Sequence, residues 1–377
     1  VDVEPDYFGI NTELIEEKIT DRTRCIIPVH LFGMPCQMDL VMAIARKHKL
    51  KVIEDSCETM FAKFDNQFVG SIGDIGCFST YVAHILTTGV GGLLTTSNPE
   101  YAVLLRSLIN HGRDSIYISV DDGKGKTPEH LKEIIERRYS FVHSGHSFRT
   151  TELEGALGLA QLEDWQSNIS NRQKNASFLN QYLKEFEEYL QLPNIRPLAD
   201  HVFMMYPLML KNKSKKGLCE YLENLGVETR DMLPLVNQSL YKEEFSNSEK
   251  DYPVSKRIVE NGFYIGSHPY ITPEMLDHIV FAFKSFFQSK NVIHLKSVLI
   301  GITSNDAQTT ETEFSNINLS LFDRIIIFDA FHTCPSDLTI KIPIEIISQE
   351  KFSMTQIYQT VIDIVIEDLV VFFHMDG

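Results

Sequence analysis

The sequence predicts an α/β protein in which a mostly parallel sheet lies between two layers of helices. In the first half of the chain, short apolar runs alternate with amphipathic stretches, and turn residues separate the two. Because parallel strands need a crossover connection, strands that alternate with helices indicate a three-layer α/β fold. At about 150 residues per domain, the 377 residues allow two or three domains.

The elements of the first half follow from local patterns. An apolar stripe predicts a helix over 38–48. Asn98 and Pro99 are typical of a helix start, a cap residue followed by Pro at the first helical position, and Gly112 ends that helix. The apolar runs predict buried strands over 25–29, 52–54, 75–79 and 92–96.

The middle of the chain has a different pattern of predicted elements. Residues 151 to about 188 predict one long helix, which suits a connection between domains. Beyond Pro193, a strand over 202–210 and helices over 214–225 and 273–287 indicate a smaller α+β domain.

Residues 291–377 form a third, acidic region that carries half of the net charge of −16. A helix is expected over 354–367, before the last of four strands. Those strands are expected over 298–302, 324–328, 342–347 and 369–373. The pattern predicts a partial, Rossmann-like α/β unit. We therefore expect domains at 1–190, 191–290 and 291–377.

The composition limits the partners. A balance of 35 Lys and Arg against 51 Asp and Glu argues against a surface built to follow nucleic-acid phosphates or anionic lipid. No apolar run approaches the roughly 18 residues that span a bilayer, so we expect no membrane span. The six cysteines are scattered without a CxxC pair, which favours free thiols and a cytoplasmic protein.

Two patterns that resemble ligand sites are interpreted as structural. The glycines of Gly70-Ser-Ile-Gly73-Asp-Ile-Gly76 are spaced like those of a nucleotide loop. The loop leads into a strand and not into a helix, which favours a tight turn. His143 and His146 form an HxxH pair, but no Cys or carboxylate nearby completes a zinc set.

Asp55 ends a predicted strand, at the edge where open α/β sheets bind ligands. Alone, such an Asp is more often a cap or turn residue. Its neighbours make it a candidate, because a set of motifs accompanies it in order: Pro28-Val29-His30-Leu31-Phe32-Gly33, Val52-Ile53-Glu54-Asp55, Phe78-Ser79-Thr80-Tyr81-Val82-Ala83-His84, Asn110-His111-Gly112-Arg113, and Gly145-His146-Ser147-Phe148-Arg149. Over residues 1 to about 288 this set resembles the DegT/DnrJ/EryC1/StrS family, sugar aminotransferases and dehydratases on the fold-type-I pyridoxal-phosphate (PLP) scaffold.

The resemblance implies a role for four residues. Asp55 would pair with the pyridine nitrogen of PLP, and Ser79 would hydrogen-bond the phosphate. Glu58 stands where the aminotransferases usually have a Gln near the ring. Ser147 stands where they often have an Asn that reaches the phosphate of a neighbouring subunit, so the resemblance also implies a homodimer.

His84 is the decisive departure from the family pattern, because the aminotransferases have the Schiff-base Lys in that position. Imidazole holds no cofactor covalently, but it exchanges protons near neutral pH. The exchange resembles the 3-dehydratase branch, which uses pyridoxamine phosphate (PMP) on nucleotide-linked 4-keto-6-deoxyhexoses in surface polysaccharide biosynthesis. Three alternatives stay open: a structural His in an inactive enzyme, a transaminase whose Lys is lost or relocated, and a non-catalytic module that binds sugar nucleotides or dimerises.

Both ends of the chain are interpreted as cut. Family members carry a phosphate loop and a ring-stacking aromatic residue before the part that matches Val1, so we expect an N-terminally truncated enzyme that holds its cofactor weakly. The tail is similar to the opening half of a family 2 GT-A glycosyltransferase. This resemblance implies that Asp329 contacts a nucleotide base and that Asp376 belongs to a motif for Mn or Mg. A generic Rossmann-like half-domain explains the tail almost equally well.

Overall fold

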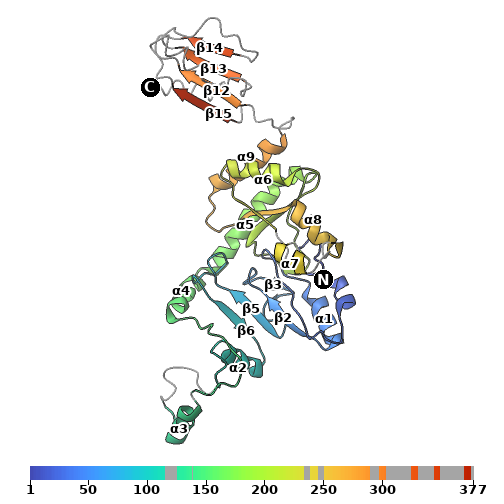
Figure 1. Cartoon of the computed structure of the whole chain (residues 1–377), viewed down its shortest axis with the longest axis vertical. Coiled ribbons are helices and arrows are strands. Elements are labelled where there is room, and N and C mark those ends of the chain that lie inside the picture. The colour runs from blue at the N-terminus through green and yellow to red at the C-terminus, as the bar shows by residue number, and fades with distance from the viewer. Residues whose placement is uncertain are drawn as a thin grey trace. The chain divides into compact units, whose positions relative to one another are not determined.

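The computed structural model describes residues 1–114, 125–137, 139–232, 238–244 and 250–288, together with four strands between 297 and 374. The chain divides into two compact units, Val1–Phe287 and Gln288–Gly377 (Figure 1). In the described ranges, no helix combines the length and the apolar character that crossing a bilayer requires.

The first unit contains a four-stranded sheet in the order β1-β2-β5-β6. Its strands are β1 (Cys25–Ile26), β2 (Lys51–Asp55), β5 (Ile75–Ser79) and β6 (Gly92–Thr95). β1, β2 and β5 run parallel, as predicted, whereas β6 is antiparallel to β5. The reversal arises because the segment between β5 and β6 turns back without a crossover helix.

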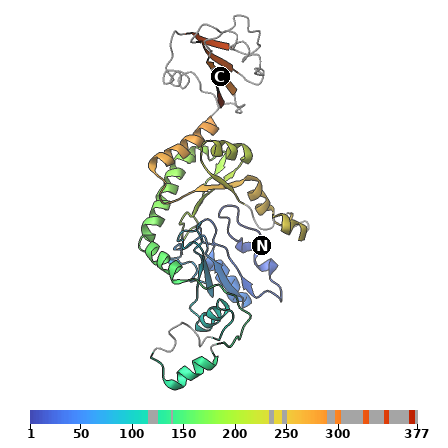
Figure 2. The same cartoon turned by 60° about the vertical axis from the view of Figure 1, so that its left-hand side comes forward.

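Helices flank this sheet. α1 (Met38–His48) packs against β1 and β2 through its buried side chains Met38, Val41 and Ala45. α2 (Pro99–Leu108) begins as predicted, because the Asn98 side chain accepts the N–H groups of Glu100 and Tyr101. α3 (Pro128–Arg137) lies away from the sheet, beyond α2 (Figures 1 and 2).

The single long helix predicted over 151–188 is wrong: there are two helices, α4 (Glu152–Leu162) and α5 (Trp165–Leu183). The break coincides with a change of environment. α4 has no buried residue, whereas α5 begins with Trp165, whose ring stacks on Phe61 at 4.6 Å, and then buries one face. α5 then runs from the first sheet along the small domain (Figure 2).

The small domain is built on an antiparallel sheet in the order β10-β11-β9-β7. Its strands are β7 (Leu190–Gln191), β9 (Met205–Leu210), β10 (Thr229–Asp231) and β11 (Gly262–Gly266). Its helices are α6 (Lys215–Asn224), α7 (Ser239–Glu244), α8 (Pro253–Asn261) and α9 (Pro273–Gln288). Tyr206, Leu218, Leu222 and Phe263 are fully buried in its core, against one face of α5.

The strand predicted over 202–210 starts later, at Met205. Phe203 has φ 47°, a left-handed conformation that no strand continues through. Val202 and Met204 pack into the core of the first sheet, and β8 (Ala199–Asp200) pairs with β3 (Lys63–Phe64), which forms a hairpin with β4 (Gln67–Phe68). The segment 199–204 therefore lies between the two cores: Val202 and Met204 pack into the first, whereas Phe203 packs into the core of the small domain.

The second unit contains a parallel sheet in the order β14-β13-β12-β15. Its strands are β12 (Ser297–Ile302), β13 (Arg324–Asp329), β14 (Ile344–Ser348) and β15 (Leu369–His374). In this order the chain first extends the sheet on one side of β12 and then crosses to the other side, as in Rossmann-like folds. The helix expected over 354–367 lies outside the described residues.

Candidate active site

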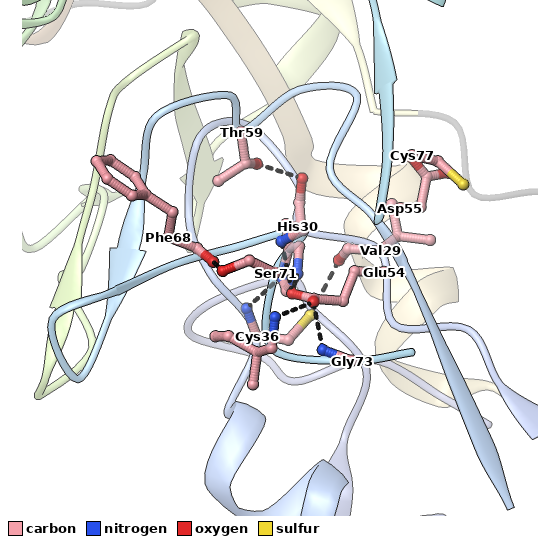
Figure 3. Close-up of polar contacts among 12 residues, drawn as sticks. Val29, His30, Cys36, Glu54, Asp55, Thr59, Phe68, Ser71, Gly73 and Cys77 are labelled. Atoms are coloured by element: carbon pink, nitrogen blue, oxygen red, sulfur yellow. Dashed lines mark hydrogen bonds and ion pairs between the residues drawn. The ribbon is translucent and has the colours of Figure 1, made fainter. Parts of the chain in front are cut away.

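Asp55 is the last residue of β2, at the carboxyl end of the parallel strands (Figure 3). Its N–H donates to the carbonyl oxygen of Pro28, and its own carbonyl accepts the His30 N–H, both at 2.9 Å. The side chain is half-buried, and its Oδ1 accepts the Cys57 N–H at 3.2 Å. A carboxylate is therefore held at the edge where open α/β sheets bind ligands.

The Cys57 thiol faces the same carboxylate. Burial, together with a hydrogen bond to Asp55 and its negative charge, raises the pKa of Cys57 to about 12. The thiol is therefore protonated near pH 7, where it is not a nucleophile, and its Sγ donates to the carbonyl oxygen of Cys77 at 3.9 Å.

His84 lies in the turn that follows β5, where its N–H donates to the carbonyl oxygen of Tyr81 at 2.9 Å. The imidazole is half-buried, and its buried Nδ1 has no hydrogen-bond partner among the described residues. Burial lowers the pKa of His84 from its usual 6.5, although the Cys57 backbone and the Asp55 carboxylate act in the opposite direction. The ring is neutral near pH 7, the state in which imidazole accepts a proton.

Glu58 brings a second carboxyl group to the turn after β2. Its Oε2 accepts the Phe32 N–H at 2.7 Å. Burial raises the pKa of Glu58, the hydrogen bond from Phe32 opposes this shift, and the Asp55 charge adds to it. Burial and the Glu58 charge also raise the pKa of Tyr264, and both residues line the same cavity. Glu58 consequently holds a proton more readily than an exposed Glu does.

The other predicted site residues are less closely joined. Ser79 ends β5, the strand beside β2, and its Oγ accepts the Tyr81 N–H at 3.2 Å. Ser147 is exposed on a loop, where its backbone forms a bridge with Asn110. No interaction in the described part of the chain joins Ser147 to the other site residues. Asp376 lies outside the described residues, whereas Asp329 ends β13.

The donor set fits an aromatic heterocycle that carries a phosphate. Asp55 would offer a carboxylate to a protonated ring nitrogen, the Ser79 hydroxyl would offer a phosphate contact, and the buried Nδ1 of His84 lacks a partner among the described residues. For a metal ion, the described ranges contain no group of three or more His, Cys, Asp or Glu side chains that are placed to bind one.

Sequence reasoning assigned no role to Glu54 and His30, which form a fully buried pair next to Asp55 (Figure 3). The available signal was a charged residue inside the apolar run of β2. The tight turn predicted at Gly70 is confirmed, with φ 79°. The turn also binds an anion, because the N–H groups of Gly70, Ile72 and Gly73 donate to the Glu54 carboxylate.

A carboxylate and a neutral imidazole thus lie at the carboxyl ends of neighbouring parallel strands, the edge where open α/β sheets bind ligands. The sequence model of the DegT/DnrJ/EryC1/StrS aminotransferase family matches residues 1–284, and the chain belongs to this family. Members of the family are PLP-dependent aminotransferases and dehydratases that act on nucleotide-linked sugars. The predictions of the family and of an enzyme are confirmed.

Similar proteins include sugar-modifying enzymes. The lipopolysaccharide biosynthesis protein RfbH of Salmonella typhimurium is 31% identical over 297 residues, which cover 76% of this chain and 68% of that protein. GDP-4-keto-6-deoxy-D-mannose 3-dehydratase of Escherichia coli O55:H7 is 27% identical over 288 residues, 74% of this chain and 72% of that enzyme.

Solved structures give the same fold. An aminotransferase from Psychrobacter cryohalolentis has a TM-score of 0.67 at 28% identity, with 76% of this chain and 74% of that chain covered. The E. coli GDP-4-keto-6-deoxy-D-mannose-3-dehydratase with bound hydrated PLP has a TM-score of 0.62 at 26% identity, with 75% and 72% covered. The first unit is thus similar in fold to PLP-dependent enzymes of fold type I.

Proposed function

We propose that the chain modifies a nucleotide-linked 4-keto-6-deoxyhexose by PLP/PMP-dependent 3-dehydration, in surface polysaccharide biosynthesis. The observation that carries this proposal is the half-buried His84, whose pKa is lowered and whose Nδ1 has no hydrogen-bond partner among the described residues. The resemblance implies that this His stands in the place of a Schiff-base Lys. The similarity to the E. coli 3-dehydratase and to RfbH supports the reaction class and the biosynthetic setting.

The residues of the site divide the work. Asp55 would keep the ring nitrogen of the cofactor protonated, and Ser79 would bind its phosphate. When bound, PMP supplies an amine for the C4 ketone and a ring that accepts electrons. His84 would accept a proton at Nδ1, which requires the neutral ring that its lowered pKa provides. Glu58, whose pKa is raised by burial, would lie near the ring.

The test measures loss of the C3 hydroxyl from GDP- and dTDP-linked 4-keto-6-deoxyhexoses by mass spectrometry, with the full chain and added PMP. Without His84, no base remains at the proposed position, so His84→Asn should lower the rate by a factor of roughly 10²–10⁴. His130→Asn, a change at a partly exposed position of α3, should leave the rate unchanged. His84→Lys should create a cofactor adduct that borohydride traps.

Other outcomes would select other functions. Amine transfer from glutamate to the 4-keto sugar would make the chain a transaminase. Binding of the sugar nucleotide without turnover, unchanged in His84→Asn, would make it a binding module. Full dehydration activity in His84→Asn would refute the proposed role of His84.

We further propose that the enzyme acts as a cytoplasmic homodimer. The five described cysteines, Cys25, Cys36, Cys57, Cys77 and Cys219, are free, which is typical of a reducing compartment. Ser147 is exposed on its loop, where a second copy can bring a phosphate to it. Sedimentation of the full chain tests the dimer, and a monomer that binds PMP with full occupancy would contradict this role of Ser147.

For the second unit we propose nucleotide-diphosphate binding of the GT-A type, with Mn or Mg. The sheet order β14-β13-β12-β15 supports it, because ligands of open parallel sheets bind where the strand order reverses, here between β12 and β15. Asp329 ends β13 at the same edge of the sheet. Binding of UDP to the full chain with Mn²⁺, measured by calorimetry, should weaken in Asp329→Asn. Equal affinity in both proteins would refute the assignment.

A further inference from the structure

The Glu54 carboxylate is fully buried, yet it has four hydrogen-bond donors (Figure 3). Its Oε2 accepts from His30 Nε2 at 3.1 Å and from the Gly70 N–H at 2.8 Å. Its Oε1 accepts from the N–H groups of Ile72 at 2.8 Å and Gly73 at 2.6 Å. Burial raises the pKa of Glu54, but the bonds from His30 and the glycine amides outweigh it and lower the pKa below 4.5. Glu54 is therefore a buried anion in a nest of donors.

His30 is the side chain that closes this nest. Its Nδ1 accepts the Cys36 N–H at 2.9 Å, so this nitrogen carries no proton. The ring proton is consequently on Nε2, where it is donated to Glu54. The two contacts fix both the tautomer and the orientation of the imidazole.

The same two residues hold the main chain of Asp55. Glu54 precedes Asp55 in β2, and successive side chains of a strand point to opposite faces, so Glu54 is anchored behind the sheet while Asp55 faces the site. His30 N–H donates to the Asp55 carbonyl at 2.9 Å, and the His30 carbonyl accepts the Thr59 hydroxyl at 2.5 Å. His30 is thus bonded to the residues on both sides of the turn that contains Cys57 and Glu58.

We infer that Glu54 and His30 are positioning residues, whose buried hydrogen bond fixes where the Asp55 carboxylate meets the ring nitrogen of the cofactor. The inference rests on the proposed role of Asp55. Neither residue touches the cofactor in this scheme. Each acts through the backbone of Asp55, because a shift of β2 at Glu54 moves the next residue with it.

The test uses His84 as a reporter and needs no cofactor. Asp55 is the charged side chain of the described residues that acts on His84, so the titration midpoint of His84 depends on the place of the Asp55 carboxylate. NMR titration of the full chain follows the histidine ring signals, and His84→Asn assigns the signal of His84. Asp55→Asn should lower the midpoint, because it removes the negative charge that favours the imidazolium.

Two substitutions of His30 separate positioning from mere stability. In His30→Gln, the amide nitrogen takes the place of Nε2 and still donates to Glu54. In His30→Asn, the amide oxygen takes the place of Nδ1 and accepts the Cys36 N–H, but the side chain is too short to reach Glu54. His30→Asn should therefore lower the His84 midpoint as Asp55→Asn does, whereas His30→Gln should keep the wild-type midpoint.

Glu54→Gln should lower the His84 midpoint too, because the new amide N–H groups would face the N–H donors that the carboxylate accepts. Glu16→Gln is the matched control, because it changes a Glu–His pair outside the nest, Glu16 with His48 at 2.7 Å. It should leave the His84 midpoint unchanged. If Glu54→Gln does not fold, the His30 pair still decides the matter.

Three results overturn the inference. One is a wild-type midpoint in both His30→Asn and Glu54→Gln while Asp55→Asn shifts it. Another is an equal shift in His30→Gln and His30→Asn, and the last is no shift in Asp55→Asn. Absence of dehydration would refute the proposed function alone, since the titration contains neither cofactor nor sugar.

Discussion

Replacing Arg172 by Met tests whether a buried cation stabilises the first unit. Arg172 lies on α5 and is 5% exposed. Its Nη1 donates to the carbonyl oxygens of Met204 at 2.9 Å and Ser267 at 3.2 Å, and its Nε donates to Asn168 Oδ1 at 2.8 Å. These contacts join α5 to the segments before β9 and after β11. All three acceptors are neutral oxygens, so no carboxylate among them compensates the charge.

The magnitude follows from two opposing contributions. Burial lowers the pKa of Arg172 from 12.5 to about 10, which at ~1.4 kcal/mol per pKa unit corresponds to a desolvation penalty of about 3 kcal/mol. Three hydrogen bonds from a charged donor contribute roughly 5 kcal/mol together, at about 1.5–2 kcal/mol each. Arg172→Met removes both contributions and keeps an unbranched, largely apolar stem. The free energy of unfolding should therefore fall by about 2 kcal/mol.

The assay is urea unfolding followed by intrinsic fluorescence. The chain has one Trp, Trp165, at the start of α5, so the signal reports on the first unit. With a slope of about 2 kcal/mol per M, the midpoint should fall by about 1 M in Arg172→Met. Arg22→Met, at an exposed position, should stay within about 0.5 kcal/mol of the wild type. Arg172→Met with wild-type or higher stability would refute the reasoning, because the desolvation penalty of the buried charge would then equal or exceed the stabilisation by its hydrogen bonds.

Three further predictions concern the turns and the site. The pKa of Glu54 is lowered on folding, so its contribution to stability is present above pH 4.5 and is lost as the pH falls below that value. Between pH 5 and 3, the urea midpoint should therefore fall less in Glu54→Gln than in the wild type. Parallel curves of urea midpoint against pH would contradict this. Gly112→Ala should expose its loop to limited proteolysis, because φ is +75° and the new Cβ would lie 1.8 Å from the His143 carbonyl oxygen. Gly155→Ala, inside α4 with open space around it, should instead stabilise the protein by up to ~1 kcal/mol. Phe61→Leu removes the ring stacked on Trp165 at 4.6 Å and should shift the fluorescence maximum to longer wavelength with a loss of about 1 kcal/mol; an unchanged spectrum would contradict the stacking.

The elements that the sequence predicts well are those with local causes. β2 and α2 follow from an apolar run and from the Asn98 cap, and neither depends on distant residues. The errors have distant causes. The break between α4 and α5 coincides with the contact of Trp165 with Phe61. The late start of β9 coincides with the left-handed backbone of Phe203, where the chain passes from the first core to the core of the small domain.

The site shows the same division. Asp55 is predictable as a candidate because it ends an apolar run, and His84 because the motif around it resembles a family whose aminotransferases have Lys there. The pair of Glu54 and His30 is 24 residues apart and forms only when β2 pairs beside the segment that follows β1. A charged residue inside a buried strand marks Glu54 as unusual, but the sequence around Glu54 does not identify its partner.

The pair of carboxylates at the end of β2 explains why the glycine spacing near residue 70 resembles a phosphate loop. A turn whose N–H groups converge is a binding site for any anion, and here the anion is supplied from within the chain. Glu54 fills that nest, so the turn is unavailable to a phosphate, and the next residue is left facing the opposite side of the sheet. The Glu54 carboxylate thus accepts the N–H groups of the turn, while the Asp55 carboxylate lies outside this nest. The inward position of Glu54 is therefore the physical reason that the Asp55 side chain is on the opposite face of the sheet, outside the nest.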